Sequence, residues 1–384
     1  MVSRRMVLMA GGAAAVVTGA GLVGYARGPG QGRAVAPWTA AGEDFGDARL
    51  NALAYAILAP NSHNRQPWEF ELEGEDTIHV YCDLNRRLPE TDPQDRQIVV
   101  SFGCMLELLS IAAAEAGYRA DVTSFPDGYP APRIDGRRLA SVRFVAGEGS
   151  PDPLFGAITR RRSNKQAYDL DRPVSGDALA ALTAPFDGLI QAGGTNDPAR
   201  VEGFKALAKG GFVTEFTTDR TRRESIDVMR IGNRAINENP DGLEMGGIPM
   251  GLMNMAGLVT PETLDTPGTV AFQSGLDMYD TLIDATPAFV WLASTDGSRA
   301  LQVEAGRAWV RLNLMAEQMG LSVHPLSQVL QEFPEMSDAY GQVHADLGVA
   351  EPGVVQMFAR VGYGPPSPAT PRWPLAAKLL PAAV

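Results

Sequence analysis

The spacing of apolar residues predicts helices and strands along most of the chain beyond residue 46. Apolar residues recur at helical spacing over 50–58, and Ala59-Pro60 ends this helix. Trp68–Glu71 and Thr77–Cys82 alternate between apolar and polar positions, which is typical of half-buried strands. A long apolar helix is expected from about Gln97 to Gly117, because glycine commonly follows the end of a helix. Further strands are expected at Ser141–Val145, Pro287–Ala293 and Val354–Val361.

A second long helix repeats part of the pattern of the first. It ends at Gly320, and a shift of 203 residues superposes Gly103 on Gly306, Leu109 on Leu312, Ala113 on Ala316 and Gly117 on Gly320. The match favours an internal duplication, although two amphipathic helices of this length also share several apolar positions by chance. Helices interspersed with strands indicate the α+β class.

The composition narrows the classes of function. With 384 residues, of which 45% are apolar, the chain can bury one large core or two ordinary ones. The net charge of −12 argues against a nucleic acid as partner. Two cysteines and four scattered histidines offer neither a thiolate metal site nor a zinc-binding spacing, so no metal is expected.

The first 26 residues are typical of an export signal. Arg4 and Arg5 precede an uncharged stretch, Met6–Gly24, as in twin-arginine signals. A membrane-spanning helix is the alternative, but five glycines lower the hydrophobicity of this stretch. We expect residues 1–26 to be a twin-arginine signal, cleaved near Ala26 or retained as an anchor, and residues 27–42 to be a linker. The twin-arginine export machinery would then carry the folded protein to the periplasm or another extracytoplasmic space.

Three separated segments carry the candidate chemistry. The polar loop, Ala59–Trp68, has hydrogen-bonding side chains at six consecutive positions, 61–66, and such density also occurs in turns capped by Asn and Ser. The basic segment, Ile158–Lys165, contains four cations and a serine, which could bind a phosphate or form a solvated surface. The tail, Gly362–Arg372, leads from an apolar strand through several prolines to one cation.

Together these segments resemble the nitroreductase family of FMN-binding oxidoreductases, most closely its subgroup with two nitroreductase-like halves in one chain. The polar loop matches the family's flavin-ring loop Ala-Pro-Ser-Ser-x-Asn-x-Gln-Pro-Trp, with Asn61 in place of the first Ser. Arg161–Lys165 matches its phosphate motif Arg-Arg-Ser-x-Arg, with Lys165 as the last residue. Three further matches are Val303–Leu321 with the following His324–Gln328, Gly362-Tyr363, and Pro371-Arg372.

The resemblance implies a flavin site built from both halves. It assigns Arg161, Arg162, Ser163, Lys165 and Arg372 to the phosphate or ribityl group, Pro60, Asn61, Ser62 and Asn64 to the ring, and Pro325, Leu326 and Ser327 to the segment facing the flavin. Main-chain N–H groups near Ser327 and Gln328 would face flavin N5, where the family has an acidic residue that this chain lacks. No protein acid or base is implied to be obligatory, because the flavin supplies the redox chemistry.

The implied fold is α+β, nitroreductase-like and FMN-dependent: a single-chain pseudo-dimer of two helix-and-antiparallel-sheet halves, 43–150 and 151–384. The polar loop occurs only in the first half and the phosphate motif only in the second, so one FMN per chain and a monomer are expected. Residues 237–264, with four methionines, form a candidate lid or an insertion packed against the body.

The resulting function hypothesis is an exported FMN-dependent oxidoreductase. It would transfer a hydride or electron pair through flavin N5 to a small aromatic, nitro- or quinone-like acceptor. The alternative is a protein that sequesters or carries FMN with little turnover. The electron donor stays open, because no dinucleotide motif is visible in the sequence.

Overall fold

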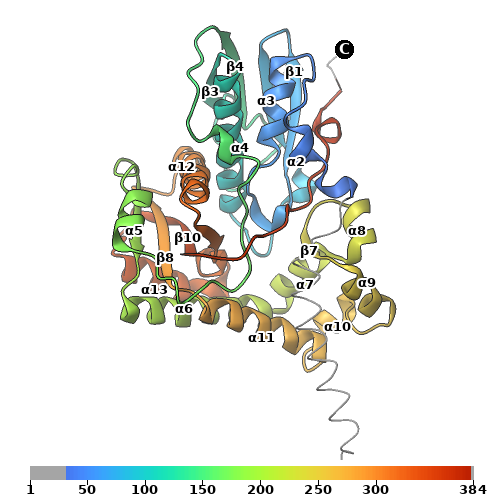
Figure 1. Ribbon diagram of the computed structural model, residues 1–384, viewed down its shortest axis with the longest axis vertical. Coiled ribbons are helices and arrows are strands. Elements are labelled where there is room, and N and C mark those ends of the chain that lie inside the picture. Colours follow the sequence, from blue (N-terminus) through green and yellow to red (C-terminus); the bar gives the residue numbers. More distant parts are fainter. Residues whose placement is uncertain (1–31, 382–384) are drawn as a thin grey trace, which may run out of the picture.

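The computed structural model describes residues 32–381, so the expected twin-arginine signal lies outside the described residues. Two four-stranded antiparallel sheets, each with its own long helix, form the body of the molecule (Figure 1). This arrangement confirms the α+β class. The strands and helices predicted from the apolar spacing are all present, with ends that differ by at most two or three residues.

The first half contains the sheet with strand order β1-β2-β4-β3. Its elements are α3 (Ala48–Ala56), β1 (Trp68–Glu73), β2 (Thr77–Cys82), α4 (Arg96–Glu115), β3 (Tyr118–Ser124) and β4 (Ala140–Ala146). Asp47 begins α3 by accepting a hydrogen bond from the main-chain N–H of Arg49, as expected of an N-cap residue. The helix α4 is long and apolar enough to cross a membrane, but most of it is buried inside the molecule.

The second half repeats this order of elements. It contains α5 (Gly176–Thr183), β5 (Ile190–Thr195), β8 (Ala288–Ser294), α12 (Arg299–Gln318), β9 (Ser322–Pro325) and β10 (Val354–Gly362), with strand order β5-β8-β10-β9. The turn η5 (Ser327–Leu330) and helix α13 (Ser337–Leu347) lie between β9 and β10. Each element of the first half therefore has a counterpart in the second at the same place in the sheet.

A large insertion separates β5 from β8. It comprises α6 (Pro198–Thr217), α7 (Asp219–Asp227), β6 (Met229–Ile231), α8 (Gly232–Glu238), β7 (Leu243–Met245), α9 (Ile248–Met255), α10 (Pro261–Asp265) and α11 (Val270–Asp284). Helices α6 and α11 run along the lower edge of Figure 1, and α8–α10 lie at its lower right. The phenylalanines Phe204, Phe289 and Phe358 join α6 to the second sheet.

The two long helices, α4 and α12, cross at a pair of glycines. An added Cβ on Gly103 would lie 2.1 Å from the carbonyl oxygen of Val303, and one on Gly306 would lie 2.0 Å from that of Val100. A shift of 203 residues converts the Gly103–Val303 contact into the Gly306–Val100 contact with the two helices exchanged. The same shift superposes both ends of α4 on those of α12. The repeated glycines of the sequence are thus explained by a close, two-fold-like crossing between the halves.

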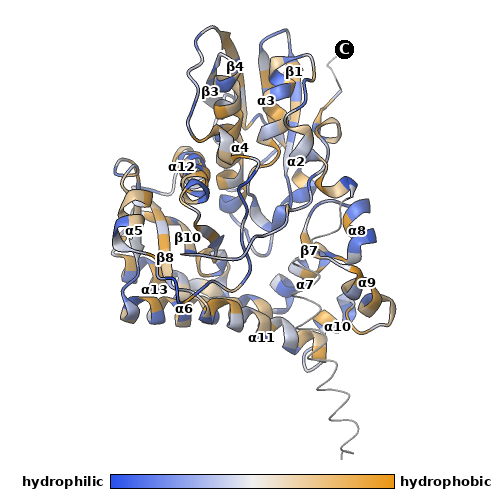
Figure 2. Cartoon of the chain, in the orientation of Figure 1, coloured by the Kyte–Doolittle hydropathy of each residue, from blue (hydrophilic) through white to orange (hydrophobic). Residues whose placement is uncertain are grey.

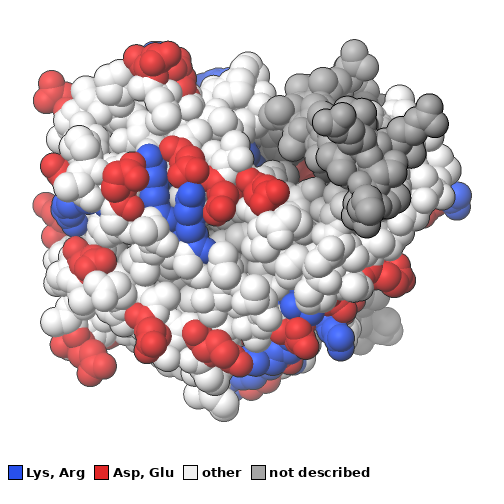
Figure 3. Space-filling model, turned by 90° about the horizontal axis from the view of Figure 1, so that it is seen from below, with Lys and Arg blue, Asp and Glu red and all other residues white. Residues whose placement is uncertain are grey.

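Hydrophobic residues of both halves merge in one core around this crossing. Figure 2 shows hydrophobic segments in the strands of both sheets and hydrophilic ones along their outer edges. Figure 3 shows the lower face, where acidic side chains prevail, in keeping with 45 acidic and 33 basic residues.

The described part of the expected linker, residues 32–42, is packed structure, so this part of the expectation is wrong. It contains η1 (Arg33–Val35) and α2 (Pro37–Ala40), with Trp38 buried. The indole Nε1 of Trp38 donates to the carbonyl oxygen of Thr370 at 2.7 Å. The segment is ordered because this aromatic side chain packs against the tail.

The tail crosses from the second half to the first (Figure 1). Beyond Arg372 it reaches the edge of the first sheet, where Leu379 bridges Phe70 in parallel and the main-chain N–H of Leu380 donates to the Phe70 carbonyl at 2.7 Å. The chain after Gly362 therefore packs on the first half, although it follows the second half in sequence.

Candidate functional site

The polar loop lies between α3 and β1 in an unusual backbone conformation. His63, Asn64 and Gln66 have positive φ angles of 45°, 50° and 49°, in a region that non-glycine residues rarely occupy. The Oδ1 atom of Asn61 accepts a 2.7 Å hydrogen bond from the Gln66 N–H, and this bond closes the loop. Ser62 joins the loop to α4, because its N–H donates to Ser101 Oγ at 3.1 Å.

Arg372 of the tail holds the polar loop in place. Its guanidinium donates to the carbonyl oxygens of Ile57, Leu58 and Ala59 at 3.0–3.1 Å. Nη1 also donates to Asn64 Oδ1 at 2.7 Å. These contacts, with others inside the tail, use every N–H of the guanidinium. Arg372 therefore positions the loop and has no donor left for a phosphate in this arrangement.

Arg161 of the basic segment is buried with most of its donors unused. It is 2% exposed, and Nη2 donates to the Leu58 carbonyl at 3.1 Å, whereas Nε and Nη1 are buried without a partner. Burial lowers the pKa of Arg161 to about 10, and the neighbouring Arg162 contributes in the same direction. A buried guanidinium with unused donors is costly unless an anion pairs with it, so this position suits a negatively charged ligand.

The remaining basic residues lie between the polar loop and β9. The guanidinium of Arg162 stacks over the Trp38 ring, 4.3 Å from its centroid, and Ser163 forms a parallel bridge with Val323 of β9. Lys165 is exposed. Burial lowers the pKa of His63 in the polar loop to about 4 and also lowers the pKa of His324 in β9, and the positive charge of Lys165 adds to both effects.

The predicted N5-facing residues form the end of β9 and the turn η5. Pro325 ends β9, and the Leu326 N–H donates to the Phe358 carbonyl at 2.8 Å. Ser327 and Gln328 begin η5, and Gln328 Oε1 accepts a 3.0 Å hydrogen bond from Tyr279 of α11. Both residues are partly exposed.

The structure thus brings together the polar loop, the basic segment and the tail, since Arg161 and Arg372 share the Leu58 carbonyl. It also shows that the side chains of Asn61 and Asn64 are engaged within the protein. Sequence reasoning missed Gln66, which is fully buried and whose Oε1 and main-chain oxygen accept bonds from Trp373 and Lys378. Its place in the Gln-Pro-Trp run was the available signal.

The insertion reaches the polar loop through residues 240–244. Gln66 Nε2 donates to the Pro240 carbonyl at 2.8 Å, and the Gly242 N–H donates to the Asn64 carbonyl at 3.1 Å. Burial raises the pKa of Glu244, and Lys165 and Arg372 oppose the rise, which places this carboxylate beside the basic residues. The start of the candidate lid therefore borders the site.

The rest of the candidate lid is packed on the insertion. Met250 and Met253 are buried in a small core with Ile226, Ile231 and neighbouring apolar residues. Met255 faces solvent and is 78% exposed. Most of residues 237–264 therefore pack within the insertion itself, and residues 240–244 are the ones hydrogen-bonded to the polar loop.

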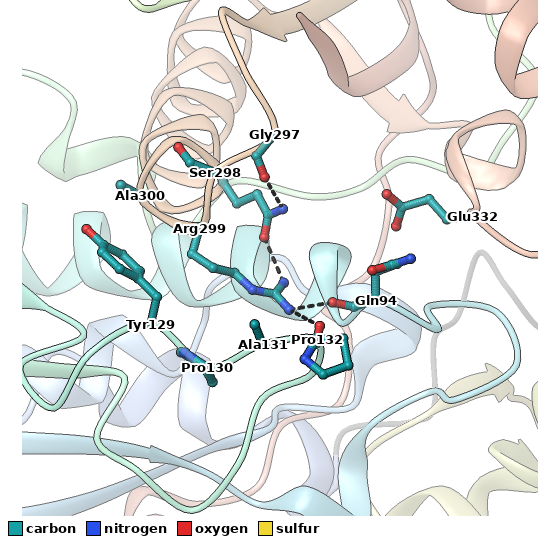
Figure 4. Close-up of a pocket in the computed structure, with 11 residues that line it drawn as sticks. Gln94, Tyr129, Pro130, Ala131, Pro132, Gly297, Ser298, Arg299, Ala300 and Glu332 are labelled. Atoms are coloured by element: carbon teal, nitrogen blue, oxygen red, sulfur yellow. Dashed lines mark hydrogen bonds between the residues drawn. The ribbon is translucent and has the colours of Figure 1, made fainter. Parts of the chain in front are cut away.

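A different cavity lies where the N-terminal ends of α4 and α12 approach each other (Figure 4). It has a volume of about 570 Å³ and is lined by residues such as Tyr129, Pro132 and Glu332. The Arg299 guanidinium donates to the carbonyls of Gln94 and Pro132 at 2.7 and 2.8 Å, which bridges the halves. None of the predicted flavin residues lines this cavity.

The residues of the candidate site fit a phosphate-bearing cofactor. Besides the two Arg161 nitrogens, Arg162 Nε and His63 Nδ1 are buried without a hydrogen-bond partner. All these atoms belong to the basic segment or the polar loop. Clustered polar atoms without partners indicate a ligand that completes them. The Ser163 hydroxyl and the exposed Lys165 add hydrogen-bonding groups of the kind that phosphate requires.

Comparison with known proteins gives the relatives of the chain. A Mycobacterium tuberculosis (strain H37Rv) protein named putative NAD(P)H nitroreductase Rv3131 is 28% identical over 338 residues, covering 85% of this chain and 90% of that protein. The chain is therefore similar over most of its length to a protein named a nitroreductase.

Another M. tuberculosis (strain H37Rv) protein, named putative NAD(P)H nitroreductase acg, is 35% identical over 98 residues, which are 26% of this chain and 28% of that protein. A solved structure of a putative nitroreductase from Anabaena variabilis covers 86% of this chain and 91% of its own, with 14% identity and a TM-score of 0.44. No protein-family model matches the chain.

Proposed function

We propose that this nitroreductase-like chain is an exported FMN-dependent oxidoreductase. It would transfer a hydride or an electron pair through flavin N5 to a small aromatic, nitro- or quinone-like acceptor. The observation that carries the proposal is the buried Arg161, whose free donors face no protein acceptor at the junction of the polar loop, the basic segment and the tail. The names of the relatives support a nitroreductase-type enzyme that uses NAD(P)H.

In this proposal Arg161, Ser163 and Lys165 hold the FMN phosphate, and Arg162 supports Arg161 from its place on the Trp38 ring. Arg372 acts on the ring side by fixing the main chain at 57–59 and Asn64. Pro60, Asn61 and Ser62 then present the strained loop to the flavin ring. When bound, the flavin supplies the redox chemistry, and the protein supplies position and electrostatics.

One observation favours the second candidate, a protein that sequesters FMN with little turnover. Residues 240–244 of the insertion are hydrogen-bonded to the polar loop at Asn64 and Gln66. Asp241 strengthens this attachment by pairing with Arg86 and Arg230 and by accepting from Trp373 Nε1 at 3.2 Å. A segment fixed in this way beside the flavin ring would restrict access of acceptors.

Reduction of the bound flavin distinguishes the two candidates. The purified protein is mixed anaerobically with NADPH or dithionite, and the flavin absorbance is followed before and after a nitro compound is added. An oxidoreductase is expected to be reduced by NADPH and reoxidised by the nitro compound. Reduction by dithionite alone, with slow reoxidation, would favour sequestration. Purification without any flavin, and failure to bind added FMN, would contradict both.

A further inference from the structure

Helix α6 of the insertion lies directly behind the turn η5. An added Cβ on Gly211 would lie 2.6 Å from Val329 Cγ1 and 3.2 Å from Val329 N, so the helix approaches the turn to a distance that only glycine permits. Glu215 follows one helical turn later, on the same face of α6, and is 6% exposed. The insertion therefore places a buried carboxyl group against the turn.

Neutral hydrogen-bond donors surround this carboxyl group. Ser225 Oγ donates to Oε1 at 3.0 Å and Gln331 Nε2 donates to Oε2 at 2.8 Å. Gln331 directly follows η5, so its bond links Glu215 to the end of the turn. At the start of the turn, Gln328 Oε1 accepts a 3.0 Å hydrogen bond from the phenol of Tyr279.

The charged groups around Glu215 do not neutralise it. Burial raises its pKa to about 7, and repulsion from Glu224 of α7 adds to the rise, whereas the neutral donors oppose it. The cations on and around α6 have partners of their own: Arg222 pairs with Asp219 and Asp265, Arg223 with Asp265, Arg220 with Glu335 and Glu90, Lys209 with Asp280 and Asp284, Lys205 with Glu202, and Arg96 with Glu332. Arg200 lies over the rings of Phe204 and Trp291, and His344 of α13 is hydrogen-bonded to the main chain at Tyr340 and Val355. Tyr279, the phenol that faces it from α11, stays neutral because burial raises its pKa.

We propose that Glu215 is the positioning residue of the turn η5, which it holds through Gln331, and that it stores a proton behind this turn. Negative charge arriving at the turn favours the neutral carboxyl group, so a proton from bulk water binds Glu215, and it returns to water when that charge leaves. The inference rests on the proposed function, because that function gives the turn its place beside the flavin.

The first test uses the apoprotein and two substitutions. Glu215→Gln retains the size and a hydrogen-bond acceptor but cannot titrate, whereas Glu215→Ala also removes the acceptor of the Gln331 amide. In infrared difference spectra, a carboxylic acid signal that titrates near pH 7 is expected in the wild type and is expected to weaken in Glu215→Gln. Amides 327–331 should exchange hydrogen about tenfold faster in Glu215→Ala, and near the wild-type rate in Glu215→Gln.

The matched control is Glu107→Gln. Glu107 is also 6% exposed but pairs with Arg307 and Arg311 at the helix crossing. Its substitution is expected to leave both the titration near pH 7 and the exchange of 327–331 unchanged. An unaltered titration in Glu215→Gln, or unaltered exchange in Glu215→Ala, overturns the proposal even if the protein binds no flavin.

The second test measures the midpoint potential of bound FMN between pH 5 and 9. In the wild type we expect reduction to be coupled to the uptake of one additional proton above pH 7, where Glu215 is otherwise ionised. The plot of midpoint potential against pH should therefore change slope near pH 7. Glu215→Gln should bind FMN and show no such bend. A bend retained in the variant would overturn the proton-storing role, whereas a wild type that binds no FMN would refute the proposed function and leave the apoprotein test to decide.

Discussion

At the scale of single residues, two buried arginines at the candidate site differ in their hydrogen bonds. Arg372 is fully engaged with main-chain oxygens and Asn64, whereas Arg161 has two nitrogens without partners. Burial lowers the pKa of Arg372 to about 9 and that of Arg161 to about 10. The first arginine therefore stabilises the loop without a ligand, and the second gains its stabilisation only when an anion binds.

Arg161→Ala is expected to weaken FMN binding about 10- to 100-fold, because a hydrogen bond to a charged group contributes roughly 1.5–3 kcal/mol. The same change should leave the unfolding free energy of the apoprotein equal or higher, because it removes an unpaired buried cation. Isothermal titration with FMN and urea unfolding measure the two effects.

Arg160→Ala is the matched control for Arg161→Ala, since Arg160 is adjacent and its side chain is 58% exposed. It should change FMN affinity less than threefold. If Arg161→Ala, even combined with Ser163→Ala, still purifies with flavin that survives dialysis, then the basic segment is a surface feature and does not hold the phosphate.

At the scale of elements, the sequence predicted strands β1, β2, β4, β8 and β10 and the long helices α4 and α12, because their apolar periodicity is local. It did not predict β3, β5 and β9, which complete the two sheets. The paired glycines of α4 and α12 were also visible, and the structure gives their reason. The helices of the insertion were harder to predict, because α6 contains Gly203, Gly210 and Gly211 and many polar residues. The bonds between Arg372 and residues 57–64 join positions more than 300 residues apart, so no local pattern could show that the tail holds the loop through Asn64.

Gly103→Ala and Gly306→Ala are each expected to lower the unfolding free energy by about 1–3 kcal/mol, because a methyl group would overlap main-chain oxygen across the crossing. Thermal or urea unfolding measures the loss. Gly210→Ala in α6 is the control, because an added Cβ there meets no neighbour, and it should be neutral or stabilise by up to ~1 kcal/mol. Equal effects at all three positions would contradict the close crossing.

The N-terminal end of α4 predicts a pH dependence of stability. Asp92 is buried and accepts bonds from the N–H groups of Gln97 and Ile98, and burial raises its pKa to about 7 despite the nearby Arg96. In the unfolded chain the Asp92 carboxyl group loses its proton near pH 4. The contribution of the protonated Asp92 to the unfolding free energy is therefore complete below pH 4 and is lost as the pH rises toward 7.

The wild type should therefore lose about 2–3 kcal/mol of unfolding free energy between pH 5 and 8 that Asp92→Asn does not lose. Urea unfolding at the two pH values measures the difference. Asp135→Asn, a change at an exposed carboxyl group with a lowered pKa, should follow the wild type. Parallel pH curves for wild type and Asp92→Asn would show that Asp92 is ionised throughout.

At the scale of the whole molecule, the proposed export of the protein depends on its first residues. Replacing Arg4 and Arg5 by Lys is expected to leave the protein in the cytoplasm, because the arginine pair is the feature that the twin-arginine route recognises. Fractionation of cells that express both forms measures this. Equal export of the double variant would refute the twin-arginine assignment and leave the proposed oxidoreductase chemistry unaffected.

The repeated halves also set the expected number of flavin sites. The strained polar loop follows α3 in the first half, whereas the counterpart after α5 in the second half, residues 184–189, lacks its Asn and Gln-Pro-Trp residues. The basic segment precedes only α5. In the proposed function, folding the halves together would complete one flavin site, at the junction where Arg161 and Arg372 share the Leu58 carbonyl, and would leave the symmetry-related position without these residues.

The measurement that tests this account most directly is the number of FMN molecules per chain, determined together with molecular mass. Flavin absorbance is compared with protein concentration while light scattering gives the mass in solution. We expect one FMN per chain in a particle with the mass of a monomer. Two FMN molecules per chain, or flavin bound only by an obligate dimer, would contradict a single site built from both halves.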